Sequence, residues 1–170
     1  METTKNKTTL LIMAAGMGSR FGSLKQLALL GPHKKTLLHY SIYDAVHAGF
    51  DKIVFIIRRS FENEFKEAVG KYAESLVETV YCFQEMDQLP GNLPPIQREK
   101  PWGTAHAIWA AKDHIHEPFI AINADDFYGR DAFVKMHDFV ASNPDERCFS
   151  LAGYRLAATL SENGKQKILH

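Results

Sequence analysis

A chain of 170 residues, with 45% hydrophobic and 24% charged residues, is long enough to bury one core without disulfides or a structural metal. We therefore expect residues 1–170 to form a single domain. Twenty basic and twenty acidic residues give a formal net charge of zero, and no basic stripe stands out. This balance argues against nucleic acid as the main partner.

The two cysteines, Cys82 and Cys148, lie in apolar surroundings and are predicted to be buried free thiols. This cysteine usage favours a cytoplasmic location. The first apolar segment, residues 8–15, is too short to span a membrane and lacks a signal-peptide cleavage region. No membrane partner is therefore expected, and the oligomeric state is left open.

The first half of the chain alternates apolar runs with amphipathic segments. Residues 9–15 are predicted to form a buried strand, and residues 36–48 have helical spacing that stops at Gly49. The β-branched run 52–57 is typical of a parallel strand covered on both faces. Ser60 is expected to cap the helix that follows.

The second half continues the alternation. Residues 77–83 are predicted to form a third strand, and residues 84–102 hold four of the seven prolines and should form an irregular loop. The remaining pattern predicts, in order, a helix, a strand, a helix and a strand over residues 103–114, 119–123, 131–142 and 148–154. Strands alternating with helices predict an α/β fold with a mostly parallel central sheet flanked by helices.

A glycine-rich turn follows the first strand and suits the binding of phosphate. Gly16 and Gly18 let backbone N–H groups approach a ligand, and Arg20 and Lys25 add positive charge. Ligands of parallel sheets bind outside the carboxyl ends of the strands, where this turn lies. An ordinary tight turn with solvated charges remains an alternative. A Walker loop is excluded because Gly-Lys-Ser/Thr is absent.

A dinucleotide-binding module is a weaker alternative. It needs an acidic residue about 20 residues after the glycines, to bind the ribose. Here the second strand ends near Arg58, about 42 residues past Gly16, and no acid closes it. Arg58 and Arg59 would suit a 2′-phosphate, but the connection is far too long.

Two further segments carry candidate residues. Asp125 follows the fourth strand, where a carboxylate commonly binds Mg²⁺ together with nucleotide oxygens. Asp126 is expected to be a turn residue, and a turn role remains open for Asp125 as well. Gly103 and Thr104 open a helix and allow close approach of a base or a phosphate. His106 and the other histidines show no metal-site spacing and are expected to be structural or surface residues.

These three motifs, in this order over about residues 8 to 155, resemble the sugar-phosphate nucleotidyltransferase (nucleotide-sugar pyrophosphorylase) family. The resemblance implies a Rossmann-like nucleotidyltransferase fold. It also implies Mg²⁺-dependent transfer of NMP from an NTP to a sugar 1-phosphate or similar phosphorylated acceptor, with release of pyrophosphate.

The resemblance also implies roles for single residues. Arg20 and Lys25 would act on the triphosphate, with Lys25 at the α-phosphate, and Asp125 would bind the metal. Nucleotide binding would fall to Ala15, Gly16, Gly18, Ser19, Gln84, Gly103, Thr104 and Asn123.

Three features depart from the family pattern. Lys25 follows Ser23-Leu24 instead of a proline, and the pair Lys25-Gln26 also resembles the cytidylyltransferases of isoprenoid synthesis, so base and acceptor stay open. The loop before Gly103 is longer and richer in proline. Family members continue well past this point with a second metal-binding aspartate, whereas the last aspartate here is Asp145. We therefore expect the C-terminal, acceptor-binding part to be missing, and a nucleotide-binding domain with little or no turnover is the alternative.

Overall fold

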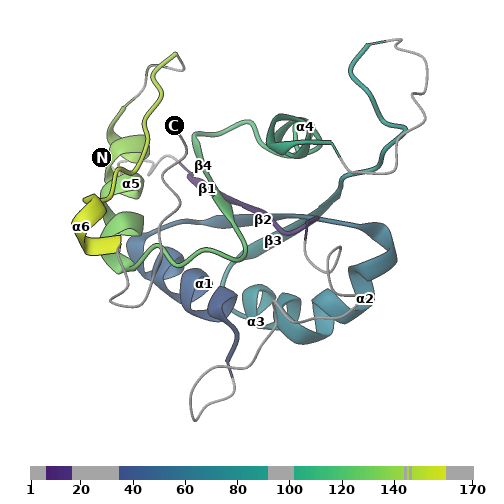
Figure 1. The fold of residues 1–170 in the computed structure, drawn as a ribbon, viewed down its shortest axis with the longest axis horizontal. Helices are drawn as coiled ribbons and strands as arrows, with labels where there is room; N and C mark the ends of the chain where they lie inside the picture. Colours follow the sequence, from purple (N-terminus) through teal and green to yellow (C-terminus); the bar gives the residue numbers. More distant parts are fainter. Residues whose placement is uncertain (1–6, 17–34, 92–101, 144, 146, 160–170) are drawn as a thin grey trace, which may run out of the picture.

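The computed structural model describes residues 7–16, 35–91, 102–143, 145 and 147–159. Within them one sheet runs through the centre, in the strand order β3-β2-β1-β4 (Figure 1). Its strands are β1 (Thr9–Met13), β2 (Lys52–Ile57), β3 (Glu78–Phe83) and β4 (Phe119–Asn123). All three pairings are parallel, which confirms the predicted mostly parallel α/β sheet.

Helices cover both faces of this sheet. They are α1 (Leu37–Ala48), α2 (Glu62–Phe65), α3 (Lys71–Glu74), α4 (Thr104–Trp109), α5 (Arg130–Ser142) and α6 (Leu156–Thr159). In Figure 1, α1, α2 and α3 lie on one side of the sheet and α4 lies on the other. Helix α5 packs beside α1.

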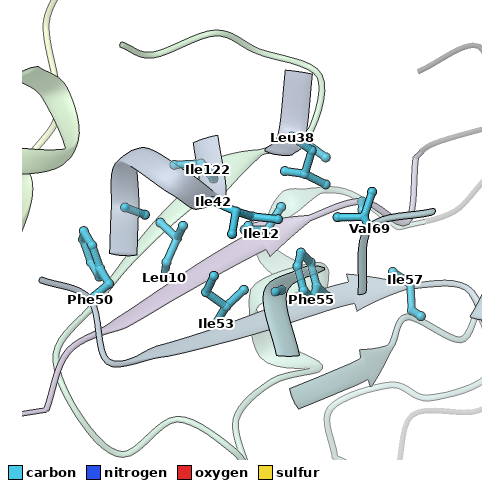
Figure 2. Close-up of a cluster of buried hydrophobic side chains, with 14 of the residues drawn as sticks. Leu10, Ile12, Leu38, Ile42, Phe50, Ile53, Phe55, Ile57, Val69 and Ile122 are labelled. Atoms are coloured by element: carbon cyan, nitrogen blue, oxygen red, sulfur yellow. The ribbon is translucent and has the colours of Figure 1, made fainter. Parts of the chain in front are cut away.

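The core follows from the alternation of side chains along the strands. On the α1 face, Leu10 and Ile12 of β1 meet Ile53 and Phe55 of β2 beneath Ile42 of α1 (Figure 2). On the α4 face, a smaller cluster gathers around Leu11, Val54, Ile56, Cys82 and Ala107. Strand β2 is buried along its whole length because it pairs on both edges and is covered on both faces.

The boundaries of α1 follow local rules. Before its first turn, the Thr36 N–H donates to Nδ1 of His39 at 3.2 Å. At its end, Gly49 adopts φ 113°, and its N–H donates to the carbonyls of Ala45 and Val46. A left-handed conformation of this kind favours glycine, which explains why the predicted stop is correct.

The predicted late strand over residues 148–154 is wrong. In the structure these residues form neither strand nor helix and pair with no described strand, and α6 follows them. Phe149 and Leu151 are 89% and 97% exposed. Cys148 is accordingly exposed and not buried as predicted, whereas Cys82 is buried as predicted. The segment is apolar, as a strand requires, but a strand also needs a neighbouring strand to pair with, and the described residues supply none.

Three smaller corrections concern element ends. Ser60 does not cap a helix, because a 3₁₀ turn over Arg59–Phe61 starts the segment, without a side-chain cap. The helix predicted over residues 103–114 is shorter, since α4 ends at Trp109 and turns follow. Strand β1 ends at Met13, two residues before the predicted end at Ala15. In the described part of the chain, no helix is long and apolar enough to cross a membrane.

Candidate functional site

Polar residues gather where the parallel strands end. Pairing continues beyond the strands, since the N–H groups of Ala14, Gln84 and Ala124 donate to the neighbouring strand at 2.8, 3.1 and 3.2 Å. The last pairs of the register are Met13 with Ile56 and with Asn123, and Ile57 with Phe83. Four residues follow these strand ends closely, Gln84 and Arg58 directly after β3 and β2, and Ala15 and Asp125 two residues after β1 and β4. We call these four residues, which follow the strands in the order β3-β2-β1-β4, the edge row. Residues from four separate parts of the sequence thus share the carboxyl edge.

Most of the edge row belongs to the α4 face of the sheet. Ala15 is buried in the cluster on that face, and Gln84 bonds to residues at the start of α4. Arg58 has extended backbone, with φ −94° and ψ 142°, so the alternation of β2 places it on the side of Ile56. These three residues therefore belong to the side of the sheet on which α4 lies (Figure 1).

Gln84 is held against the start of α4. Its Nε2 donates to the Trp102 carbonyl at 3.0 Å and lies 3.4 Å from the Gly103 carbonyl and 3.3 Å from Nδ1 of His106. His106 in turn donates from Nε2 to the Gln88 carbonyl at 2.5 Å, which leaves its Nδ1 as an acceptor. The amide nitrogen of Gln84 is thus used by the protein, whereas no described residue donates to its Oε1.

Two predicted nucleotide-binding residues, Gln84 and Gly103, therefore lie close together. His106 accepts a hydrogen bond from Gln84. Only its place three residues after Gly103 distinguishes His106 from the other histidines in the sequence. Its contact with Gln84 spans 22 residues of sequence, so the pairing depends on the tertiary fold.

Two glycines of the site leave open space beside the backbone. A Cβ at Gly16 or Gly103 would meet no described atom within 4 Å, and neither residue has the positive φ that favours glycine. Gly103 is the N-cap of α4, a position where glycine is favoured. The open space at both glycines would also let a ligand approach the backbone closely. Thr104, the first residue of α4, is exposed beside Gly103.

The two aspartates after β4 differ in their contacts. Asp126 accepts from Nδ2 of Asn123 at 2.9 Å and from the Tyr128 hydroxyl at 3.4 Å, which suits the turn role expected for it. Tyr128 also accepts from the Asn123 N–H at 2.9 Å. Asp125 is exposed, and within the described residues its carboxylate has no hydrogen bond or ion pair.

The donor set near Asp125 suits a cation that shares its ligands with a substrate. No group of three or more His, Cys, Asp or Glu side chains that could hold a metal occurs among the described residues. A single carboxylate is enough for Mg²⁺, which is usually bound by one or two carboxylates together with water and nucleotide phosphates. The residues present therefore fit Mg²⁺ bound jointly with a nucleotide.

Four predicted site residues, Gly18, Ser19, Arg20 and Lys25, lie outside the described residues. The described part of the site comprises Ala15, Gly16, Gln84, Gly103, Thr104, Asn123 and Asp125.

A hollow of about 430 Å³ opens beside the edge row at the ends of β2 and β3. Arg58, Gln84 and Glu85 are among its lining residues. Arg58 is half-buried, and its guanidinium has no hydrogen bond or ion pair with the described residues. Its motif suggested only a dinucleotide site, although its place directly after a central strand was a usable signal.

A parallel sheet covered on both faces, with binding residues collected at its carboxyl edge, is the architecture of Rossmann-like nucleotide-binding proteins. The family model described as Nucleotidyl transferase matches residues 9–157. The chain belongs to this nucleotidyl transferase family, which confirms the resemblance found in the sequence.

Several known proteins are similar to this chain. UTP--glucose-1-phosphate uridylyltransferase of Bacillus subtilis is 28% identical over 130 residues, which cover 68% of this chain and 43% of the relative. A solved UDP-glucose pyrophosphorylase complexed with UDP-glucose aligns with TM-score 0.52 and 21% identity, over 78% of this chain and 53% of that one.

A putative glucose-1-phosphate thymidylyltransferase from Bacillus anthracis aligns with TM-score 0.56 and 18% identity, over 78% of this chain and 50% of that one. At these identities the solved structures support the fold alone. The chain spans about half the length of the relatives it matches.

Proposed function

We propose that the protein transfers a nucleoside monophosphate from an NTP to a phosphorylated small molecule, such as a sugar 1-phosphate, with release of pyrophosphate. The acceptor's phosphate oxygen would attack the α-phosphorus, and the bond to pyrophosphate would break. In such reactions positioning and electrostatic stabilisation supply most of the rate enhancement. Gly16 and the turn after it would receive the triphosphate, and Gln84, Gly103 and Thr104 would receive the base.

The observation that carries this proposal is the shared position of Asp125 and the Gly16 turn. Met13 and Asn123 form the last pair of β1 with β4, and Ala15 and Asp125 each follow that pair by two residues. A carboxylate with no hydrogen bond or ion pair to the described residues therefore lies at the same sheet edge as Gly16, where a Cβ would meet no described atom within 4 Å. One phosphate chain lying along that edge would reach both.

Mg²⁺ would be held by Asp125 and by phosphate oxygens of the nucleotide. When bound, the ion offsets negative charge on the triphosphate. Asn123 would act indirectly, because its side-chain amide already donates to Asp126 and so holds the turn after β4 in place. Arg20 and Lys25 would supply the remaining positive charge from the glycine-rich segment.

The test is pyrophosphate release, measured with each of four NTPs and glucose 1-phosphate in the presence of Mg²⁺. We expect release with at least one NTP. Lys25→Ala should lower the rate by about 100-fold or more, since removing one group that stabilises a transition-state charge commonly costs that much. Its melting temperature should stay unchanged. Wild-type turnover in Lys25→Ala would remove this lysine from the mechanism.

A second candidate is nucleotide binding without transfer. The chain matches 43% of the length of the Bacillus subtilis relative, so contacts that the relative makes elsewhere are not represented in the alignment. In this case an NTP with Mg²⁺ would raise the melting temperature, while no pyrophosphate would appear with any acceptor. Absence of both effects would reject the two candidates together.

A further inference from the structure

Arg58 stands between the two halves of the proposed nucleotide site. Arg58 directly follows β2, which pairs with β1, the strand before the glycine-rich turn, and with β3, the strand before Gln84. Its side chain is half-buried and has no hydrogen bond or ion pair with the described residues. Guanidinium carries five N–H donors and is rarely buried without partners. The described part of the fold thus gives no reason for a cation at this position.

The neighbour Arg59 is engaged differently. Its guanidinium lies 4.0 Å from the centre of the Phe83 ring, and its Nε is 3.9 Å from Oε1 of Glu85. Two adjacent arginines therefore have different surroundings. Arg59 packs against its own strand ends, whereas Arg58 remains available to a ligand.

The surroundings of Arg58 favour a neutral ligand over a phosphate. Glu85 and Asp87 line the same hollow, and their carboxylates would repel a polyanion. Oε1 of Glu85 is buried and, apart from the ion pair with Arg59 at 3.9 Å, has no hydrogen-bond partner among the described residues. Oε1 of Gln84, next to Arg58 in the edge row, also accepts from no described residue. The hollow thus offers donors from Arg58 beside acceptors, which is the pattern that recognises the edge of a heterocycle.

We propose that Arg58 is a base-selecting residue. It donates to a carbonyl oxygen of the nucleobase, while Oε1 of Gln84 accepts from the ring N–H beside that carbonyl. Uracil, thymine and guanine present a carbonyl next to a ring N–H, whereas adenine has no carbonyl. The hollow, about 430 Å³, is large enough for a base. This inference rests on the function proposed above and deepens it by naming the class of nucleotide.

The experiment compares the binding of UTP, GTP, ATP and inorganic tripolyphosphate, each with Mg²⁺, by isothermal titration calorimetry. The proteins are the wild type, Arg58→Met and the matched control Arg59→Met. Methionine keeps most of the aliphatic stem and removes the donors. Circular dichroism melting verifies that each variant is folded.

We expect the wild type to bind UTP or GTP at least about tenfold more tightly than ATP, as one charge-assisted hydrogen bond would provide. Arg58→Met should bring this ratio to within about twofold and leave tripolyphosphate binding unchanged. Arg59→Met should keep the wild-type ratio.

Three results would overturn the inference while leaving nucleotide binding intact. They are equal loss of tripolyphosphate and NTP affinity in Arg58→Met, an unchanged UTP-to-ATP ratio in that variant, and an equal effect of Arg59→Met. A wild type that binds none of the nucleotides would reject the proposed function itself. A variant that fails to fold is replaced by Arg58→Lys, which keeps the charge but loses the planar guanidinium, and should still lower the ratio.

Discussion

At the scale of single residues, Asp125 and Asp126 have the same chemistry and different surroundings. Asp126 fixes the turn after β4 through Asn123 and Tyr128. Asp125 is exposed and makes no such contact within the described residues. A carboxylate without contacts to the described residues is available to a cation. Asp126 therefore suits a structural role and Asp125 a binding role.

This difference gives a prediction with an internal control. Asp125→Asn should weaken Mg²⁺-dependent NTP binding by about tenfold or more, because the amide lacks the negative charge that the ion requires. The melting temperature should not change. Asp126→Asn should instead lower the melting temperature slightly and keep the Mg²⁺ dependence. Calorimetric titration of an NTP with and without Mg²⁺ checks both variants, and an unaffected Mg²⁺ dependence in Asp125→Asn would place the ligand elsewhere.

At the scale of elements, a buried ion pair joins the strand starts, at the edge of the sheet opposite to the site. Nζ of Lys52 lies 3.0 Å from Oε1 of Glu117, with side-chain exposures of 11% and 18%. Glu117 also accepts from the Thr9 hydroxyl and from the N–H of His116. Burial of the Glu117 carboxylate opposes ionisation, but these hydrogen bonds and Lys52 outweigh it and lower its pKa to about 2. The pair thus ties β1 and β2 to the segment before β4.

The lowered pKa of Glu117 means that its ionised form stabilises the folded state. The ionised Glu117 stabilises the fold above about pH 4.5, and this contribution is lost as the pH falls from there towards 2. Glu117→Gln should therefore lower the free energy of unfolding at pH 7 by about 2 kcal/mol, with a smaller difference at pH 3. Urea unfolding of both proteins at the two pH values checks this.

The matched control is Glu78→Gln. Glu78 pairs with Lys7 at 3.2 Å, but both side chains are about half exposed or more. Exposed pairs contribute little, so this variant should change the free energy of unfolding by less than about 0.5 kcal/mol. A Glu117→Gln difference that does not shrink between pH 7 and pH 3 would contradict the role given to its ionisation.

The elements also show what the sequence could and could not predict. Strand β2 was predictable because its apolar residues form an unbroken run, and the end of α1 was predictable because Gly49 has a local conformational reason. The segment over residues 148–154 has the same apolar character, but pairing is a non-local property. The site shows the same division. Gln84 and Gly103 could be found from motifs, whereas the contact of Gln84 with His106 and the position of Arg58 required the register of the sheet.

At the scale of the whole molecule, large apolar side chains are left on the surface near the end of the described chain. Phe127, Phe149, Leu151 and Leu156 are 68%, 89%, 97% and 66% exposed. The Tyr154 hydroxyl donates to the Tyr128 carbonyl at 2.8 Å, which returns this segment to the loop after β4. Strand β4 is also one of the two edge strands of the sheet within the described residues. An unpaired edge together with exposed apolar side chains favours association with other molecules.

We therefore predict that this surface drives self-association of the 170-residue chain. The double change Phe149→Ser and Leu151→Ser should lower the associated fraction in sedimentation velocity at high protein concentration. It should change the free energy of unfolding by less than about 0.5 kcal/mol, since both side chains are almost fully exposed in the monomer. Leu76→Ser is the control, because Leu76 is 41% exposed and lies apart, between α3 and β3. Equal association of the wild type and the double variant would show that residues 149 and 151 do not contribute, whereas loss of stability in the double variant would show that the segment is packed within the monomer.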